Sequence, residues 1–343
     1  MLKVREAARE MPGVVTAVSA ERTHYGESIR QARWVEGPVF IIGPGAAMNA
    51  ARAGARALEW LLGWPALARE AAEFRNYSWA VLRPRSAVIA VSASGEDAEV
   101  VEVAQRASRL GVGVLALTAN LESALAQAAR AVFRLPSPAD GSALLIRPLA
   151  EHTALFEIAM AAAKIFNPRN PRIQAVEAEF EKLPERIPWM QIHLLDPIRA
   201  CAARLEGCRR LLMAGGSFYH TAAEEAVTLA RRVTPRIIDA VEVEGAAEFL
   251  PGALNFADAV LLLSSSRFRG KKSAHALAAR LKAGATKTLA ITDGTDRDLV
   301  SLCEFSVLTP ELPEIPGCLL SMILAQWLIV EIASGGATAT RSG

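Results

Sequence analysis

Short runs of apolar residues alternate with longer amphipathic stretches along this chain. Clear apolar runs lie at 39–42, 88–91 and 114–118, whereas the stretches at 98–110 and 272–283 repeat their apolar residues with a helical period. Apolar runs without polar alternation are typical of parallel strands that are buried on both faces. The pattern therefore predicts strands joined by helices, and an α/β fold with doubly wound parallel sheets.

The same succession of segments occurs twice. Five features of the first half recur in the same order about 171 to 175 residues later, and such regular spacing predicts a tandem duplication. The pairs are Gly45 with Gly216, Glu73 with Glu248 (each in an AAEF segment), Ser92 with Ser264, Val114 with Thr288, and Pro136 with Pro310. We expect a first domain at 20–165, a linker and helix at 166–194, and a second domain at 195–335.

Composition narrows the class of protein. The 343 residues include 38 Lys+Arg and 36 Asp+Glu, and this net charge of +2 argues against a nucleic-acid-binding protein. Hydrophobic residues make up 52% of the chain and charged residues 22%, which excludes an intrinsically disordered protein.

Several features predict a cytoplasmic protein without a membrane partner. Charged residues interrupt the N-terminus throughout, unlike a secretory signal. The apolar run at 318–330 contains Gln326 and is shorter than the ~18–20 residues that cross a membrane. The four cysteines form no CxxC pair and have no histidine-rich surroundings, so we expect reduced thiols and no metal site.

Small and hydroxyl-bearing residues follow the apolar run at 88–91. A turn over Ser92–Asp97 would offer an anion two hydroxyl groups together with the open N–H groups and the positive dipole end of the next helix. This turn would also follow the carboxyl end of a strand, where open α/β sheets bind their ligands. The structural alternative is that Ser94 caps the helix and Asp97 completes a capping box.

Five segments resemble those of the tandem sugar isomerase (SIS) domain family. They are SxSGE at 92–96, EMP at 10–12, AAEFR at 71–75, AGGSFYHTAAEEA at 214–226, and the stretch 316–333 with its Gln-Trp-Leu. The likeness is greatest to the isomerase part of glucosamine-6-phosphate synthase and to related phosphosugar deaminases and deglycases. It implies two domains, each a five-stranded parallel sheet flanked by helices in a flavodoxin-like or Rossmann-like three-layer arrangement. It also implies a homodimer with sites near the subunit interface, and a sugar-phosphate ligand without a cofactor.

The resemblance implies substrate-binding residues at the strand ends. They are Gly45, Ala47, Ser92, Ala93, Ser94, Gly95, Asp97, Arg147, Gly216 and Ser217. Two positions depart from the family: Asp97 replaces a threonine, and Ala47 lies in a first glycine loop that lacks its usual serine. A carboxylate about 6 Å from a phosphate dianion would cost on the order of 1–3 kcal/mol. The departures therefore predict weaker phosphate binding or a less charged ligand.

The residues that transfer protons in the family are also replaced. Arg231 stands at the position of the family's glutamate base, and Leu250 lies in the segment that should hold its ring-opening histidine. The carboxylates and imidazoles that could substitute for them are Glu248, Glu225, His152 and His220. The structural alternatives are helix caps or salt bridges for the glutamates, and surface or helix-start positions for the histidines.

A second loop with anion-binding chemistry lies at 264–272. Its three serines and four cationic side chains could hold a phosphate or a sugar acid. The alternative is a solvated turn with a basic helix start.

Two functions follow from these residues. The first is a phosphosugar isomerase or deaminase of amino-sugar metabolism, acting by proton transfer through an enediol or enolamine. The second is a non-catalytic sugar-phosphate sensor or regulatory protein that has lost the family's glutamate and histidine. An unrelated nucleotide-binding protein is disfavoured because the sequence contains neither a GxGxxG nor a P-loop pattern.

Overall fold

The computed structural model describes residues 2–137 and 143–339. The chain divides into two compact units. The N-unit comprises residues 10–181, and the C-unit comprises 182–339 together with 2–9. The division falls inside the segment 166–194 that the sequence assigns to a linker and helix.

The N-unit is built around a five-stranded parallel sheet with the strand order β2-β1-β3-β4-β5. Its strands are β1 (Val39–Gly43), β2 (Ala66–Glu70), β3 (Ala87–Val91), β4 (Gly113–Thr118) and β5 (Ala131–Arg134). Its helices are α1 (Leu2–Ala20, which begins in the C-unit residues), α2 (Arg22–Gln31), α3 (Met48–Leu61), α4 (Ala71–Tyr77), α5 (Ala98–Arg109), α6 (Ala124–Ala128), α7 (Ala143–Phe166) and α8 (Arg172–Phe180). Short 3₁₀ turns lie at Gly45–Ala47 and Trp79–Val81.

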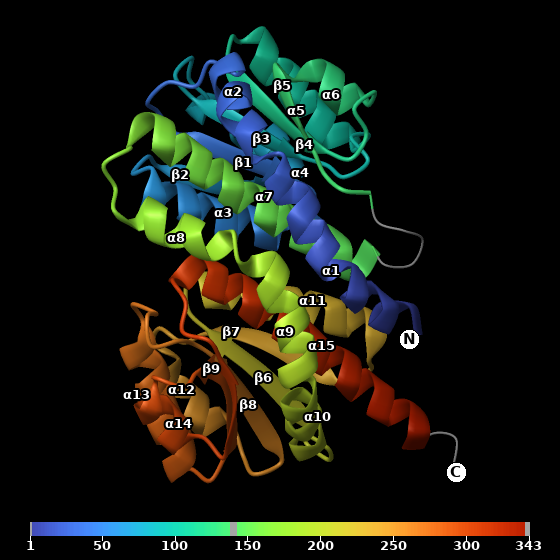
Figure 1. The fold of residues 1–343 in the computed structure, drawn as a ribbon, viewed down its shortest axis with the longest axis vertical. Coiled ribbons are helices and arrows are strands. Elements are labelled where there is room, and N and C mark those ends of the chain that lie inside the picture. The colour runs from blue at the N-terminus through green and yellow to red at the C-terminus, as the bar shows by residue number, and fades with distance from the viewer. Residues whose placement is uncertain (1, 138–142, 340–343) are drawn as a thin grey trace. The chain divides into compact units, whose positions relative to one another are not determined.

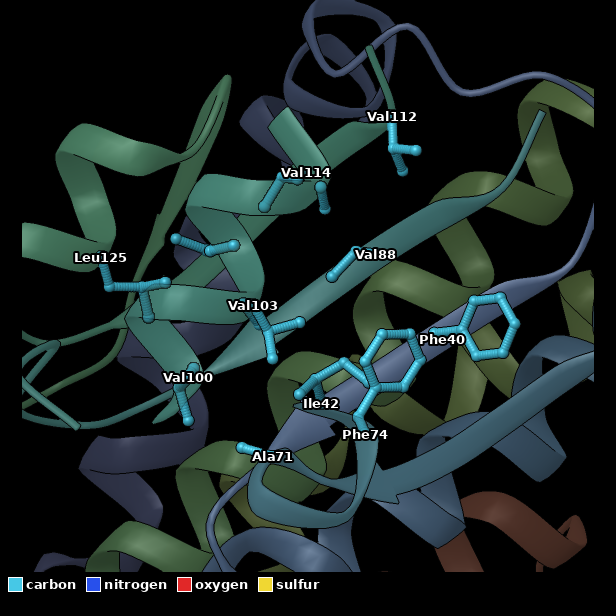
Figure 2. Packing of buried hydrophobic residues seen from close by; sticks show 14 of the residues in the cluster. Phe40, Ile42, Ala71, Phe74, Val88, Val100, Val103, Val112, Val114 and Leu125 are labelled. Atoms are coloured by element: carbon cyan, nitrogen blue, oxygen red, sulfur yellow. The ribbon is translucent and has the colours of Figure 1, made fainter. Parts of the chain in front are cut away.

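Helices cover both faces of this sheet (Figure 1). One layer contains α3 and α7, which pack on each other, and the other contains α4, α5 and α6. The second layer and the sheet enclose a core in which Phe40 and Ile42 of β1 meet Phe74 of α4 and Val103 of α5 (Figure 2). The apolar residues of α5 recur at Val100, Val103, Ala104 and Ala107, which places one face of this helix in the core.

The C-unit has the same strand order, because its sheet runs β7-β6-β8-β9-β10 and all its pairs are parallel. Its strands are β6 (Arg210–Gly215), β7 (Ile237–Glu242), β8 (Asp258–Leu263), β9 (Lys287–Asp293) and β10 (Phe305–Thr309). Its helices are α9 (Leu183–His193), α10 (Leu195–Arg204), α11 (Phe218–Val233), α12 (Ala246–Ala253), α13 (Lys271–Ala283), α14 (Arg297–Leu302) and α15 (Glu314–Ala339). The predicted α/β class, with two five-stranded parallel sheets flanked by helices, is confirmed.

The strand at one edge of each sheet is not evident from the apolar pattern. β2 and β7 are only partly buried, so polar residues interrupt them, and the alternation of apolar runs predicts only four strands in each half. Each edge strand leads into an AAEF segment, which begins α4 in the N-unit and α12 in the C-unit. The fifth strand followed only from the family resemblance.

Helix α15 corrects one expectation about apolar runs. The segment Glu314–Gly335 is long and apolar enough to cross a membrane, because its mean hydropathy stays high even though it contains Gln326. However, 89% of its most apolar window is buried, and the helix packs against α10 and α11 of its own unit. This burial is typical of the core helix of a soluble protein.

Candidate functional site

The candidate site lies at the carboxyl edge of the N-unit sheet. Because β1, β3 and β4 are parallel neighbours, the loops that follow them emerge at the same edge. Ser92–Asp97 follows β3 and leads into α5, a helix of 12 residues that begins at Ala98. The loop thus lies at a strand end and a helix start, as the sequence predicts.

Hydrogen bonds within the loop fix its shape. The hydroxyl of Ser92 accepts from the backbone N–H of Gly95 at 2.9 Å and donates to Oδ2 of Asp97 at 2.5 Å. The Ser94 hydroxyl accepts from the backbone N–H of Glu96 at 3.2 Å. The N-cap residue of α5 is Asp97, and its side chain caps no backbone N–H. The capping box between Ser94 and Asp97 is therefore absent, since Asp97 bonds Ser92 instead.

The loop is held against the loop that follows β4. The Ala93 carbonyl accepts from the backbone N–H of Ala119 at 3.0 Å, and the Gly95 carbonyl accepts from that of Leu125 at 3.0 Å. Gly95 has φ +74°, and a β-carbon there would lie only 2.0 Å from Oγ of Ser123. Only glycine fits this position, because a side chain would be strained and would overlap its neighbour.

The first glycine loop lies beside this one, since β1 pairs with β3. Gly45 and Ala47 form a 3₁₀ turn in which Ala47 is buried. A β-carbon on Gly45 would be 3.5 Å from Oε1 of Glu70, the last residue of β2. A carboxylate therefore approaches this loop, where the family resemblance implies a phosphate ligand. Arg147, on α7, is directed to Glu151 at 3.8 Å.

In the C-unit, the matching loop after β6 faces two carboxylates. The backbone N–H of Ser217 donates to Oε1 of Glu242 at 3.1 Å. The carboxylate of Glu244 lies between Gly216 and Gly270, so that a β-carbon on Gly216 would be 2.7 Å from it. The chain's own anions therefore lie at Gly216 and Ser217, which the resemblance assigns to substrate binding.

The serine loop after β8 is also engaged internally. The Tyr219 hydroxyl donates to Oγ of Ser265 at 2.8 Å, and the Ser266 backbone N–H donates to Oδ2 of Asp293 at 2.7 Å. Burial alone would raise the pKa of Asp293, but hydrogen bonds from Thr295 and Ser266 outweigh it and lower the pKa.

Cationic side chains of this segment have partners inside the unit. Arg267 pairs with Glu311 at 2.6 Å, and the Lys271 ammonium donates to the Ser266 carbonyl at 2.7 Å. Both cations would therefore have to give up an internal partner to bind an external anion.

Comparison with known families identifies the N-unit. Residues 34–163 match the family model described as SIS domain. The N-unit thus contains a match to the SIS domain over most of its length. The match covers β1 to β5 and most of α7, and so includes the Ser92–Asp97 loop.

Solved structures with the same fold cover nearly the whole chain. The C-terminal domain of glucosamine-fructose-6-phosphate aminotransferase from Francisella tularensis matches with a TM-score of 0.78 at 15% identity, over 97% of this chain and 95% of that one. Tagatose-6-phosphate ketose/aldose isomerase from Escherichia coli matches with a TM-score of 0.74 at 16% identity, over 97% and 92%. Glucosamine-6-phosphate deaminase from Thermotoga maritima matches with a TM-score of 0.68 at 15% identity, over 95% of each chain. The comparison with curated proteins finds no match.

The two histidines that could serve as acids or bases in this protein have different environments. His152 on α7 is fully buried, and its Nδ1 is 2.8 Å from the Pro148 carbonyl oxygen. Since a carbonyl only accepts, Nδ1 carries the proton, and burial lowers the pKa of His152 to about 4. His220 on α11 lies 3.7 Å from Glu224 and 3.9 Å from Glu242.

The two glutamates that could substitute for the family base differ in exposure. Glu225 on α11 is buried, whereas Glu248 is exposed in the first turn of α12. Arg231 and Leu250 stand where the resemblance implies a base and a histidine. Arg231 is exposed and pairs with Asp239 at 3.6 Å, and Leu250 is buried. Within 2–137 and 143–339, no group of three or more His, Cys, Asp or Glu side chains is arranged to hold a metal ion.

The sequence alone did not indicate three glutamates that lie near these loops. Glu70 ends β2 opposite Gly43, and Glu242 ends β7 opposite Gly215, so they occupy the same register position in the two sheets. Glu244 follows Glu242 by two residues. The repeat relates Glu70 to Glu242, but this pair is not apparent without the edge strands β2 and β7, which the apolar pattern does not predict.

Proposed function

We propose that this protein belongs to the SIS domain family and binds a sugar phosphate at the Ser92–Asp97 loop. The observation that carries the proposal is the tight turn at Gly95, which brings the hydroxyls of Ser92 and Ser94 to the start of α5. A helix start and hydroxyl groups together suit an anionic group. The names of the three similar structures all refer to sugar 6-phosphates, which supports this class of ligand.

We further propose that the protein acts on its ligand by proton transfer, as an isomerase or a deaminase. Moving a proton between adjacent carbons of a sugar requires a base and no redox cofactor. Glu248 is the best candidate for this base among the four predicted residues, because it is the exposed carboxylate. Glu225 and His152 are buried, and they would serve as positioning groups.

The second candidate function is a non-catalytic sugar-phosphate sensor. It is favoured by Arg231 and Leu250, which place an exposed guanidinium and a buried alkyl group where the family has its base and its histidine. A protein that kept the loop and lost these two groups would bind the ligand without converting it.

The shared strand order supports a wider proposal about the chain. We infer that the C-unit is a second SIS domain, because its sheet repeats the order of the first and its segments repeat those of the first about 171 to 175 residues later. The predicted homodimer, with sites near the subunit interface, forms part of this proposal.

Calorimetry and turnover assays test the function. The double variant Ser92→Ala/Ser94→Ala should lose the affinity for fructose 6-phosphate, glucosamine 6-phosphate and tagatose 6-phosphate, whereas Ser28→Ala on α2 should keep it. If the double variant binds as well as the natural chain does, the site is wrong. Conversion of a bound ligand that Glu248→Gln abolishes would establish the enzyme, and binding without conversion would establish the sensor.

A further inference from the structure

Asp97 and Ser92 form a direct hydrogen bond at the proposed ligand loop. Oδ2 of Asp97 lies 2.5 Å from Oγ of Ser92, and this hydroxyl also accepts from the Gly95 backbone N–H at 2.9 Å. A serine hydroxyl has a single proton to donate. Since Asp97 receives that proton, Ser92 has none left for a ligand.

A ligand phosphate would need the same proton. Phosphate oxygens carry no proton to donate when the group is a dianion, so a phosphate that contacts Ser92 must accept from its hydroxyl. The phosphate and the Asp97 carboxylate therefore compete for one hydrogen bond. The competition is between two anions that would also repel each other across the loop.

The neighbouring charges do not neutralise Asp97. In the part of the chain that the structure describes, Asp97 has no ion-pair partner. The nearby cation Arg75 is directed to Glu99 at 3.9 Å and to Glu102 at 3.7 Å. Glu96 adds a further negative charge, although its carboxylate accepts from the Ala124 backbone N–H at 3.2 Å.

We propose that Asp97 is a specificity-determining residue that lowers the affinity of the loop for dianionic phosphate esters. This inference rests on the proposed function, because it assumes that the ligand group lies at the Ser92–Asp97 loop. One negative charge about 6 Å from a dianion, at an effective dielectric of about 40–80, weakens binding about 10- to 100-fold. The same charge weakens the binding of a monoanion only about 3- to 10-fold.

Two sugar esters of the same shape separate charge from size. Fructose 6-phosphate is a dianion at pH 8, and fructose 6-sulfate is a monoanion. Their affinities are measured by calorimetry for the natural chain, Asp97→Asn and Asp97→Thr. The control Glu99→Gln removes one charge from the same helix without touching Ser92. Circular dichroism confirms that each variant is folded.

We expect Asp97→Asn and Asp97→Thr to bind fructose 6-phosphate about 10- to 100-fold more tightly than the natural chain. The gain for fructose 6-sulfate should be about 3- to 10-fold, and Glu99→Gln should change either affinity by less than about threefold. Equal gains for the two esters, or no gain for either, would overturn the role of Asp97 and leave the proposed function standing. If no folded variant binds fructose 6-phosphate, glucosamine 6-phosphate or tagatose 6-phosphate, the proposed function fails with it.

Discussion

Replacing Gly95 by alanine tests whether the ligand loop depends on its contact with the loop after β4. Gly95 has φ +74°, and an alanine β-carbon there would lie 2.0 Å from Oγ and 2.4 Å from the β-carbon of Ser123. Oγ1 of Thr118 would be 2.9 Å away. These distances are far below van der Waals contact, so the two loops would have to separate.

The expected cost has two parts. An L-residue in the left-handed region costs about 1–2 kcal/mol, and overpacking a tight contact adds about 1–3 kcal/mol. Gly95→Ala should therefore lower the free energy of unfolding of the N-unit by about 2–5 kcal/mol. It should also abolish ligand binding, because separating the loops would move the backbone N–H of residue 95 away from the Ser92 hydroxyl that accepts from it.

Gly111 provides a matched control in the same unit. It has φ +78°, but a β-carbon there would have no heavy atom within 4 Å. Gly111→Ala thus incurs the conformational cost alone, about 1–2 kcal/mol. Urea unfolding followed by circular dichroism and tryptophan fluorescence gives both values for the same cooperative unit.

A second substitution isolates the overlap. Ser123→Gly removes the two atoms that a β-carbon on Gly95 would meet first, so the cost of Gly95→Ala in this background should fall towards that of Gly111→Ala. Equal costs for Gly95→Ala and Gly111→Ala in the natural background would refute the packing argument. A cost that persists unchanged with Ser123→Gly would refute the identity of the contact.

Two further predictions concern pH. Burial would raise the pKa of Asp258, but the Asn255 backbone N–H and the Arg210 guanidinium hold it below its usual range. Asp258→Asn should therefore lower the free energy of unfolding by about 1–3 kcal/mol at pH 7. In urea titrations this gap between the natural chain and the variant should close as the pH falls below about 3.9. A gap that is unchanged at pH 3 would contradict this account. The pKa of His152 is lowered to about 4 in the folded protein, so its imidazole is protonated in the unfolded chain at a higher pH than in the folded one. The free energy of unfolding should therefore fall as the pH decreases from about 6.5 towards 4. His152→Leu should lack this component of the pH dependence, and the same slope in both proteins would show that His152 does not cause it.

The apolar pattern alone predicts most of the fold. Strands such as β3 and β4 are buried along their whole length, and their continuous aliphatic runs are visible in the sequence. The partly buried edge strands β2 and β7 are not, because polar residues interrupt them and only their pairing with β1 and β6 makes them strands. The local motif SxSGE likewise located the loop at the start of α5, since a strand end, a turn and a helix start are consecutive.

The side-chain partners within the site were decided by tertiary structure. The sequence indicated that Asp97 departs from the family, but the bond that it makes with Ser92 depends on the path of the turn at Gly95. That turn packs against Ser123, 28 residues away, in a loop that a neighbouring strand brings close. The sequence alone is equally compatible with an exposed His152, and only the packing of α7 shows that this side chain is buried. Composition and periodicity thus determined which layers form, because burial follows residue type locally. The hydrogen-bond partners and the burial of single groups required the fold, because they join residues that only the parallel sheet brings together.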